Sequence, residues 1–254
     1  MKRSLVFSKR TGKEILRDPL TFIFCLGFPM VMLLIMTIVN KSIPAQAAMK
    51  IFTMPYLAPG VVIFGFTFIM QFTCLQISKD RSTAFLIRLY ASPMKPKDFI
   101  LGYTFPILVI ALLQAALTYA VSFVVGAVVQ DTLQIGNLLL CLPVLLPAAL
   151  LFLGFGLLFG TLLNEKAAPG ISSILITVAC LLGGIWMDVD ALGGVIKDVS
   201  HCLPFYHTVQ AARMAVLGRF DELWKPLLIT CLWALAVYLV AVWTLQHQMK
   251  KDIA

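Results

Sequence analysis

Charged residues are scarce in this sequence of 254 residues. Asp, Glu, Lys and Arg make up 13% of it, against about 25% in ordinary soluble domains, while 60% of the residues are hydrophobic. The few charges gather in short segments between long apolar runs, so they could not cover a buried core with a water-soluble surface. The composition therefore excludes a soluble globular domain and indicates that lipid surrounds much of the chain.

Catalytic and metal-binding motifs are also missing. The sequence has no Gly-x4-Gly-Lys-Ser/Thr loop, whose backbone amides would hold nucleotide phosphates. His201 and His207 lie on opposite sides of Pro204 with no evident third ligand, so we expect no metal site. Few ionisable side chains interrupt the apolar runs, which argues against a proton relay or an ion-coupled carrier. With no nucleophile paired to a base at membrane depth, we predict that the chain is not an enzyme and holds no cofactor.

Six apolar runs are long enough to cross a membrane as helices, which need roughly 20 residues to span about 30 Å of hydrocarbon. The predicted fold is an all-α integral membrane protein with a single transmembrane domain over residues 1–254. The predicted transmembrane helices are residues 20–39, 55–77, 99–125, 138–163, 168–187 and 224–246.

The basic residues indicate how the chain is oriented. A net charge of +8 could suggest nucleic-acid binding, but Lys and Arg flank the apolar runs instead of interleaving with exposed aromatic residues. Fourteen of the twenty Lys and Arg lie in residues 2–17, 79–97, 166 and 250–251, which share one side if both termini are cytoplasmic. We predict a multi-pass protein of the plasma membrane with cytoplasmic N- and C-termini and no nucleic-acid partner.

Residues 1–19 are predicted to form an amphipathic helix on the membrane surface. Leu5, Ile15 and Leu16 fall on one side of a helical wheel, opposite a basic arc that would attract the head groups of anionic membrane lipids. Pro19 then ends the helix and lets the chain turn into the bilayer. The alternative is a basic tail that only orients the first crossing.

Residues 79–98 have the pattern of a short amphipathic helix that stops at Pro93. Its apolar side chains form i,i+4 pairs, Phe85 with Leu89 and Leu86 with Tyr90. A cytoplasmic partner could bind such a helix, or the helix could lie on the membrane surface without a partner. Residues 188–223 are too long for a plain connection and too apolar for a solvated loop, which predicts an external re-entrant hairpin.

Several of these stretches together resemble the ATP-binding-cassette type-2 permease family, whose members export drugs, antibiotics, polysaccharides and lipids. The resemblance covers nearly the whole chain. It is carried by Arg17-Asp18-Pro19, by Asp80-Arg81 with Leu86, Arg88-Leu89, Ala91-Ser92-Pro93 and Gly102, and by Gly183-Gly184-Ile185-Trp186 with Leu203-Pro204-Phe205-Tyr206-His207 and Arg213.

The resemblance implies a division of labour between subunits. Residues 79–98 would be the coupling helix that docks into a separate nucleotide-binding ATPase subunit, which would bind ATP and Mg²⁺. A second permease copy or a paralogue would face this one through the first and fifth helices. The implied docking residues are Arg81, Phe85, Leu86, Arg88, Leu89, Tyr90, Pro93 and Glu165. The implied external gate consists of Trp186, Pro204, Tyr206, His207 and Arg213.

Polar side chains inside the predicted helices are candidates for lining a transport path. They are Gln71, Gln114, Thr118, Ser172 and Thr177. Gln114 and Thr118 share a helix face, so they could line a path or bond to neighbouring helices, whereas Gly156 and Gly160 are typical of close helix packing. A path without fixed charges suits an amphiphilic or hydrophobic cargo, such as a drug, an antibiotic, a lipid or a lipid-linked glycan. The predicted function is the membrane subunit of an exporter, and the alternative is a non-transporting membrane anchor or sensor with the same fold.

Overall fold

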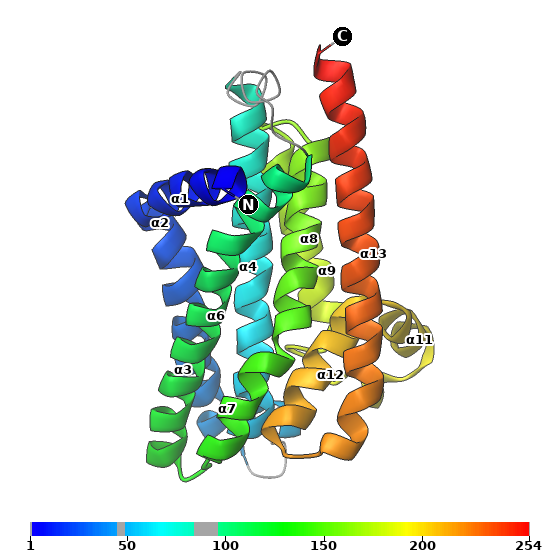
Figure 1. Ribbon diagram of the computed structural model, residues 1–254. Coiled ribbons are helices and arrows are strands. Elements are labelled where there is room, and N and C mark those ends of the chain that lie inside the picture. Colours follow the sequence, from blue (N-terminus) through cyan, green and yellow to red (C-terminus); the bar gives the residue numbers. More distant parts are fainter. Residues whose placement is uncertain (1, 45–48, 84–95, 254) are drawn as a thin grey trace.

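The structure is a computed structural model that describes residues 2–44, 49–83 and 96–253 (Figure 1). All regular elements in these ranges are helical. The N-terminal part contains α1 (Lys2–Arg17), α2 (Pro19–Phe22), the π-helical segment Ile23–Gly27, α3 (Phe28–Ser42), a 3-10 turn at Lys50–Phe52 and α4 (Met54–Ser82). The rest contains α6 (Pro96–Val129), α7 (Ile135–Val144), α8 (Leu146–Leu162), α9 (Ala168–Leu182), α10 (Val189–Leu192), α11 (Gly194–Cys202), α12 (Pro204–Val216) and α13 (Phe220–Ile253).

Four helical stretches within the described residues are long and apolar enough to cross a membrane: Ile23–Ser42, Met54–Ser82, Asp98–Val129 and Phe220–Gln248. The pair α7 and α8, bent by 41°, makes a fifth if it counts as one crossing. The sequence predicted six. The difference arises at α9, which is apolar but has only 15 residues, or about 22 Å, short of the roughly 30 Å of a bilayer core.

The predicted helix 138–163 is broken in the structure. Its two parts meet at Leu145, and Pro147 follows in the first turn of α8. Proline has no N–H to bond the carbonyl four residues earlier, here that of Pro143, and its ring would clash with that carbonyl. The bend between α7 and α8 therefore has a local cause in the sequence.

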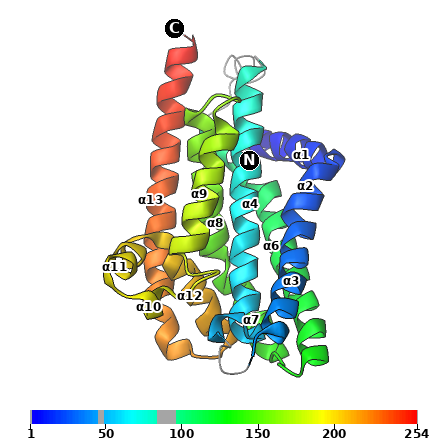
Figure 2. The same cartoon turned by 180° about the vertical axis from the view of Figure 1, so that it is seen from behind.

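Helix α4 forms the centre of the bundle and is the most deeply buried of the candidate crossings (Figures 1 and 2). Its first residue is capped from the α6–α7 turn, where Asp131 accepts a hydrogen bond of 2.6 Å from the N–H of Met54. Glycines let α8 approach it closely. A Cβ added to Gly156 would lie 2.7 Å from the carbonyl oxygen of Met70, and one added to Gly160 would lie 2.9 Å from that of Cys74. The close packing predicted for this glycine pair is confirmed.

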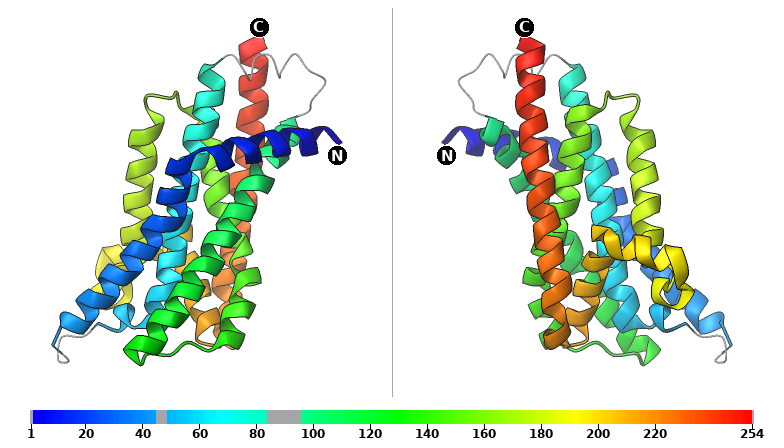
Figure 3. Two further views of the ribbon diagram at one scale, coloured as in Figure 1. Left: turned by 90° about the vertical axis from the view of Figure 1, so that its left-hand side faces the viewer. Right: turned by 90° about the vertical axis from the view of Figure 1, so that its right-hand side faces the viewer.

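Helix α1 lies across the end of the bundle, as Figures 1 and 3 show. The predicted helix is present. On its predicted apolar side, Leu5 and Leu16 are largely exposed, whereas Ile15 is buried in one row with Thr11 and Phe7. Contact of the exposed side with the membrane surface stays a prediction. The row of Phe7, Thr11 and Ile15 faces the bundle, where α1 packs on α6. The sequence of α1 alone does not show which of its sides meets α6.

One face of α13 is apolar and exposed along most of the helix. Trp224 and Trp243 are 72% and 65% exposed, and an exposed row joins them: Leu228, Leu232, Leu235 and Leu239. The two tryptophans are separated by 19 residues, or about 28 Å of helix, which matches the thickness of the hydrocarbon core. Tryptophan favours both membrane–water interfaces, so these two side chains frame the apolar band of the bundle.

Residues 188–223, predicted to form an external re-entrant hairpin and called the hairpin below, consist of the short helices α10, α11 and α12. The chain turns between α10 and α11 at Gly193 and Gly194, whose φ angles of +67° and +58° favour glycine, and turns again between α11 and α12 at Leu203. Helix α11 exposes Val195, Ile196 and Val199, whereas α12 is buried against α4, α7 and α13. Figure 3 shows α12 continuing toward the end of the bundle opposite α1. The external position of the hairpin stays a prediction.

Candidate functional site

Two of the predicted docking residues meet at the end of the bundle near α1. The guanidinium of Arg81, at the end of α4, donates a hydrogen bond to the carbonyl oxygen of Thr161 in the last turn of α8. Ser82 Oγ donates to Glu165 Oε2 over 2.7 Å, which ties α4 to the turn between α8 and α9. The remaining predicted docking residues, Phe85, Leu86, Arg88, Leu89, Tyr90 and Pro93, lie outside the described residues, and their role stays a prediction.

A buried carboxylate next to this patch holds three helices together. Asp80 in α4 accepts a 2.7 Å hydrogen bond from Tyr103 Oη in α6 and lies 3.8 Å from Arg10 Nη2 in α1. Arg10 is paired at 2.6 Å with Glu14, and Glu14 also accepts from Gln76 over 3.5 Å. In the sequence, Asp80 belongs to a motif of the family resemblance but has no predicted role. Its position at the end of an apolar helix could have indicated a structural contact, because a buried carboxylate needs polar partners nearby.

The predicted path residues are scattered. Gln114 is fully buried, donates to Thr118 Oγ1 over 3.1 Å and packs against Gly65 of α4, so both Gln114 and Thr118 are engaged in helix contacts. This placement agrees with packing between helices, the other alternative that the sequence left open. Ser172 is buried and bonds to its own helix at Ala168.

Gln71 and Thr177 lie nearer the surface of the bundle. Gln71 Nε2 lies 3.5 Å from Ser173 Oγ and so joins α4 to α9, whereas Thr177 is exposed and bonds back to the carbonyl of Ser173. Gln71 also lines a cavity of about 420 Å³ between α4 and the segment that leads into α3. Of the five predicted residues, only Gln71 lines this cavity.

Two of the predicted gate residues, Tyr206 and His207, belong to a polar cluster between α10, α11 and α12. Asp190 is its centre: its carboxylate accepts a 2.6 Å hydrogen bond from Tyr206 Oη, lies 3.0 Å from His201 Nε2 and lies 3.7 Å from Lys197 Nζ. The rings of His201 and Tyr206 stack with centroids 4.2 Å apart. Burial raises the pKa of Asp190. The hydrogen bonds from Tyr206 and His201, together with the charges of His201 and Lys197, lower it more, so the pKa falls below its ordinary value.

Arg213 joins α12 to two other parts of the bundle. It is only 4% exposed. Its Nη2 donates to the carbonyl oxygen of Gly184 over 2.8 Å and its Nε donates to that of Tyr56, in the first turn of α4, over 3.3 Å. The guanidinium also lies over the Tyr56 ring, 5.9 Å from its centroid. We call these contacts the Arg213 latch.

The last two predicted gate residues have packing contacts. Pro204 is buried at the start of α12, where its missing N–H leaves no hydrogen bond unmade. Trp186 packs edge-on against Phe64 of α4, with ring centroids 5.1 Å apart. The five predicted gate residues therefore occupy the region between α9, α12 and the first half of α4, while their gating role stays a prediction. Asp190, His201 and Lys197 were missed, since nothing in the spacing shows which carboxylate Tyr206 finds.

The residues described by the structure contain no group of three or more His, Cys, Asp and Glu side chains placed to hold a metal ion.

Comparison with known proteins gives two findings. Residues 4–217 match the sequence model of the family described as "ABC-2 type transporter". The chain is also 25% identical over 219 residues to the Bacillus subtilis (strain 168) protein named "Putative transport permease YvfS", a match that covers 85% of this chain and 86% of that protein. Both findings agree with the family that the sequence motifs resembled.

Proposed function

The chain belongs to the ABC-2 type transporter family, and we propose that it is the permease of an exporter driven by a separate ATPase subunit. Two permease copies, or one copy and a paralogue, would form the membrane part. The ATPase subunits would bind ATP and Mg²⁺, and this chain would supply the pathway. As a permease, this chain would be a multi-pass membrane subunit, and ATP hydrolysis would take place on the ATPase subunits.

The observation that carries the proposal is the continuity of α4. This helix has 29 residues, or about 43 Å of length. Tyr56 in its first turn accepts from Arg213 of the hairpin, and Asp80, Arg81 and Ser82 in its last turns contact α1, α6, α8 and the α8–α9 turn. One rigid helix thus connects the predicted gate with the end that leads into the predicted coupling segment.

This connection supports a mechanism of alternating access. Closure of two ATPase subunits would displace residues 79–98, and α4, clamped at this end by Asp80 and Arg81, would move as a rigid body. Because Arg213 holds the other end of α4, the movement would strain or release the Arg213 latch and open the path on the outer side. ATP binding would favour one state and hydrolysis the other.

The arrangement of the termini supports six crossings with both termini on one side. Figure 1 shows α1 and the C-terminal part of α13 at the same end of the bundle, which requires an even number of crossings. The four long helices and the bent pair of α7 and α8 would make five crossings, an odd number, so the proposal needs one more. We assign that crossing to α9 together with α12, since α9 is apolar and α12 continues to the opposite end. With the basic residues inside, both termini would be cytoplasmic in the plasma membrane.

The proposed cargo is an amphiphilic or hydrophobic molecule rather than a small ion. Two observations support it: ionisable side chains are scarce in the apolar runs, and phenylalanines line the cavity beside Gln71. ATP-dependent accumulation of a labelled amphiphile in inverted vesicles that contain the permease and its ATPase tests the export proposal. A non-transporting anchor or sensor would give no accumulation, and that outcome would establish the alternative.

Replacing both Leu86 and Leu89 by Asp is expected to release the ATPase subunit. Two carboxylates on the apolar side of the predicted coupling helix would have to be buried without partners in the docking groove, which costs several kcal/mol, roughly 2 or more for each group. Co-purification in detergent measures the loss, with permease levels in the membrane measured in parallel. The control is Gln246→Asp, which adds an acidic group to an exposed position on α13. Full retention of the ATPase by the double variant would contradict the docking role.

A further inference from the structure

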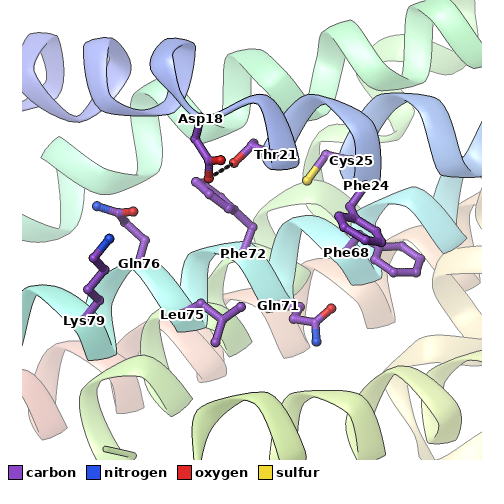
Figure 4. Close-up of a pocket in the computed structure, with 10 residues that line it drawn as sticks. All are labelled: Asp18, Thr21, Phe24, Cys25, Phe68, Gln71, Phe72, Leu75, Gln76 and Lys79. Carbon is purple, nitrogen blue, oxygen red and sulfur yellow. Dashed lines mark hydrogen bonds between the residues drawn. The ribbon is translucent and has the colours of Figure 1, made fainter. Parts of the chain in front are cut away.

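The cavity between α4 and the start of the first crossing has a polar end and an apolar end. Its walls come from residues 18–25, around α2 and the π-helical segment, and from residues 68–79 of α4. Figure 4 shows Lys79, Gln76 and Asp18 toward one end, and Phe68 and Phe24 toward the other. Its volume, about 420 Å³, lies within the range of small-molecule sites. We call it the α2–α4 groove.

We propose that the α2–α4 groove binds a single-chain amphiphile with a small anionic headgroup, the headgroup at Lys79 and the chain along the phenylalanines. This inference rests on the proposed function and specifies its cargo: the groove would be the position where an amphiphile from the cytoplasmic leaflet first enters the permease. Nothing in the family match or in the related permease assigns such a site.

The charge at the polar end selects the headgroup. Lys79 is exposed and, within the described part of the chain, makes no ion pair. The carboxylate of Asp18 already accepts a 2.8 Å hydrogen bond from Thr21. An ammonium without an ion pair at the edge of the apolar region attracts a phosphate, sulfate or carboxylate. Gln76, on the same side of the groove, already donates toward Glu14 over 3.5 Å. A cationic headgroup would pair with Asp18 instead and would leave the charge of Lys79 without a partner, so Lys79 favours the anion.

The apolar end accepts a chain of limited width. From Lys79 to Phe68, α4 advances by eleven residues, or about 16 Å, so a chain anchored at Lys79 could lie along the helix as far as Phe68. Phe72 and Leu75 line the middle of that course, and Phe24 stands at its rim with 48% exposure. The exposure of Phe24 means that a chain can reach the groove from the side of the bundle.

The position of the groove fits entry from the membrane surface. Asp18 follows α1 directly, and α1 lies across the end of the bundle, so the polar end of the groove is at the level of α1. The apolar end lies deeper along α4, beside Gln71, which contacts α9. A headgroup near α1 and a chain deeper in the bundle is the orientation that an amphiphile already has in the leaflet, so binding requires no inversion.

Photo-crosslinking of the purified permease in lipid nanodiscs, without ATPase or ATP, tests the inference. The probe is dodecyl phosphate carrying a diazirine at the end of its chain, and the competitors are dodecyl phosphate, dodecanol and inorganic phosphate. We expect crosslinks on Phe24, Phe68 and Phe72, and competition by dodecyl phosphate at concentrations about tenfold lower than dodecanol requires. Inorganic phosphate alone should not compete, because the chain supplies the burial.

Lysine variants give the matched comparison. Lys79→Gln should weaken labelling about tenfold, the change expected when one charge-assisted hydrogen bond is lost, and Lys79→Arg should restore it. Lys166→Gln removes the same charge from an exposed position at the same end of the bundle but outside the groove, and it should leave labelling within about twofold of the natural protein, as a surface charge does.

Four results would overturn the inference: equal labelling in Lys79→Gln and Lys166→Gln, equal competition by dodecanol, full competition by inorganic phosphate, or labelling spread evenly onto the outer face of α13. The last would identify ordinary surrounding lipid. Protection of the groove by a second permease copy rather than by the competitor would also overturn it, because the occupant would then be protein. ATP plays no part in this assay, so a failed inference leaves the exporter proposal standing. Conversely, a permease that binds the probe but gives no ATP-dependent accumulation would contradict the exporter proposal and leave the binding site standing.

Discussion

Replacing Arg213 by Glu is expected to reduce ATP-dependent cargo accumulation about tenfold or more while the ATPase subunit stays bound. In the Arg213 latch, one guanidinium satisfies the carbonyl oxygens of Gly184 and Tyr56 in a site that water does not reach. A carboxylate there would face two carbonyl oxygens of the same sign of charge and would be buried without a partner, at a cost of about 3–5 kcal/mol. The contact between α12 and the start of α4 would be lost, and with it the coupling of the hairpin to α4.

Arg219→Glu is the control for this experiment. Arg219 lies between α12 and α13, is exposed, and forms only a surface pair with Glu222 at 3.8 Å, so its replacement should change transport little. Lys at position 213 should give an intermediate rate, because an ammonium lacks the planar fork that holds both carbonyls. Melting temperatures in detergent would separate loss of fold from loss of coupling. Transport at the natural rate in folded Arg213→Glu, or an equal loss in Arg219→Glu, would contradict the role of the latch.

Replacing Gly156 by Val is expected to separate α8 from α4 and to lower the melting temperature of the permease in detergent strongly. Even one methyl group at this position would lie 2.6 Å from Thr73 Cβ and 2.7 Å from the backbone oxygen of Met70, and neither can move without shifting α4. Overpacking of this kind costs about 1–3 kcal/mol for Ala and more for Val.

Gly170 provides the matched comparison. It lies in the first turn of α9, and a Cβ added there meets nothing within 4 Å, so Gly170→Val should melt close to the natural protein. Fluorescence-detected size-exclusion chromatography after heating measures both variants. Equal melting temperatures for Gly156→Val and Gly170→Val would mean that α4 and α8 are not held at the distance seen here.

The sequence determines the class of fold because long apolar helices and flanking charges are local features. It does not determine which face of a helix packs. Leu5 and Leu16 mark one apolar side of α1, but the row that packs on α6 contains Phe7. The ring centroids of Phe7 and Tyr103 are 4.9 Å apart, and Phe7 covers Gly102. Gln114 likewise had two possible roles, and only the position of Gly65 on a different helix distinguishes them.

The candidate site was predictable to a similar degree. The family resemblance singled out Asp80-Arg81, which lies at the end of α4, and Arg213, as a residue of the implied gate. Their partners were not predictable, since Arg213 reaches Tyr56 across 157 residues and Asp190 pairs with side chains of two later helices. The α2–α4 groove had no signal in the sequence, because it depends on how two helices diverge.

The π-helical turn at Ile23–Gly27 determines which way the first crossing faces. The buried positions of this crossing recur at every fourth residue, from Thr21 through Cys25, Pro29 and Leu33 to Thr37. In a regular α-helix, four residues overshoot one turn by about 40°, so such a row would wind steadily around the axis. The wider π turn removes part of that surplus rotation between Thr21 and Cys25, at the start of the row. A single irregular turn thus shifts the phase of the helix that follows and reduces the angle through which the buried row winds around it.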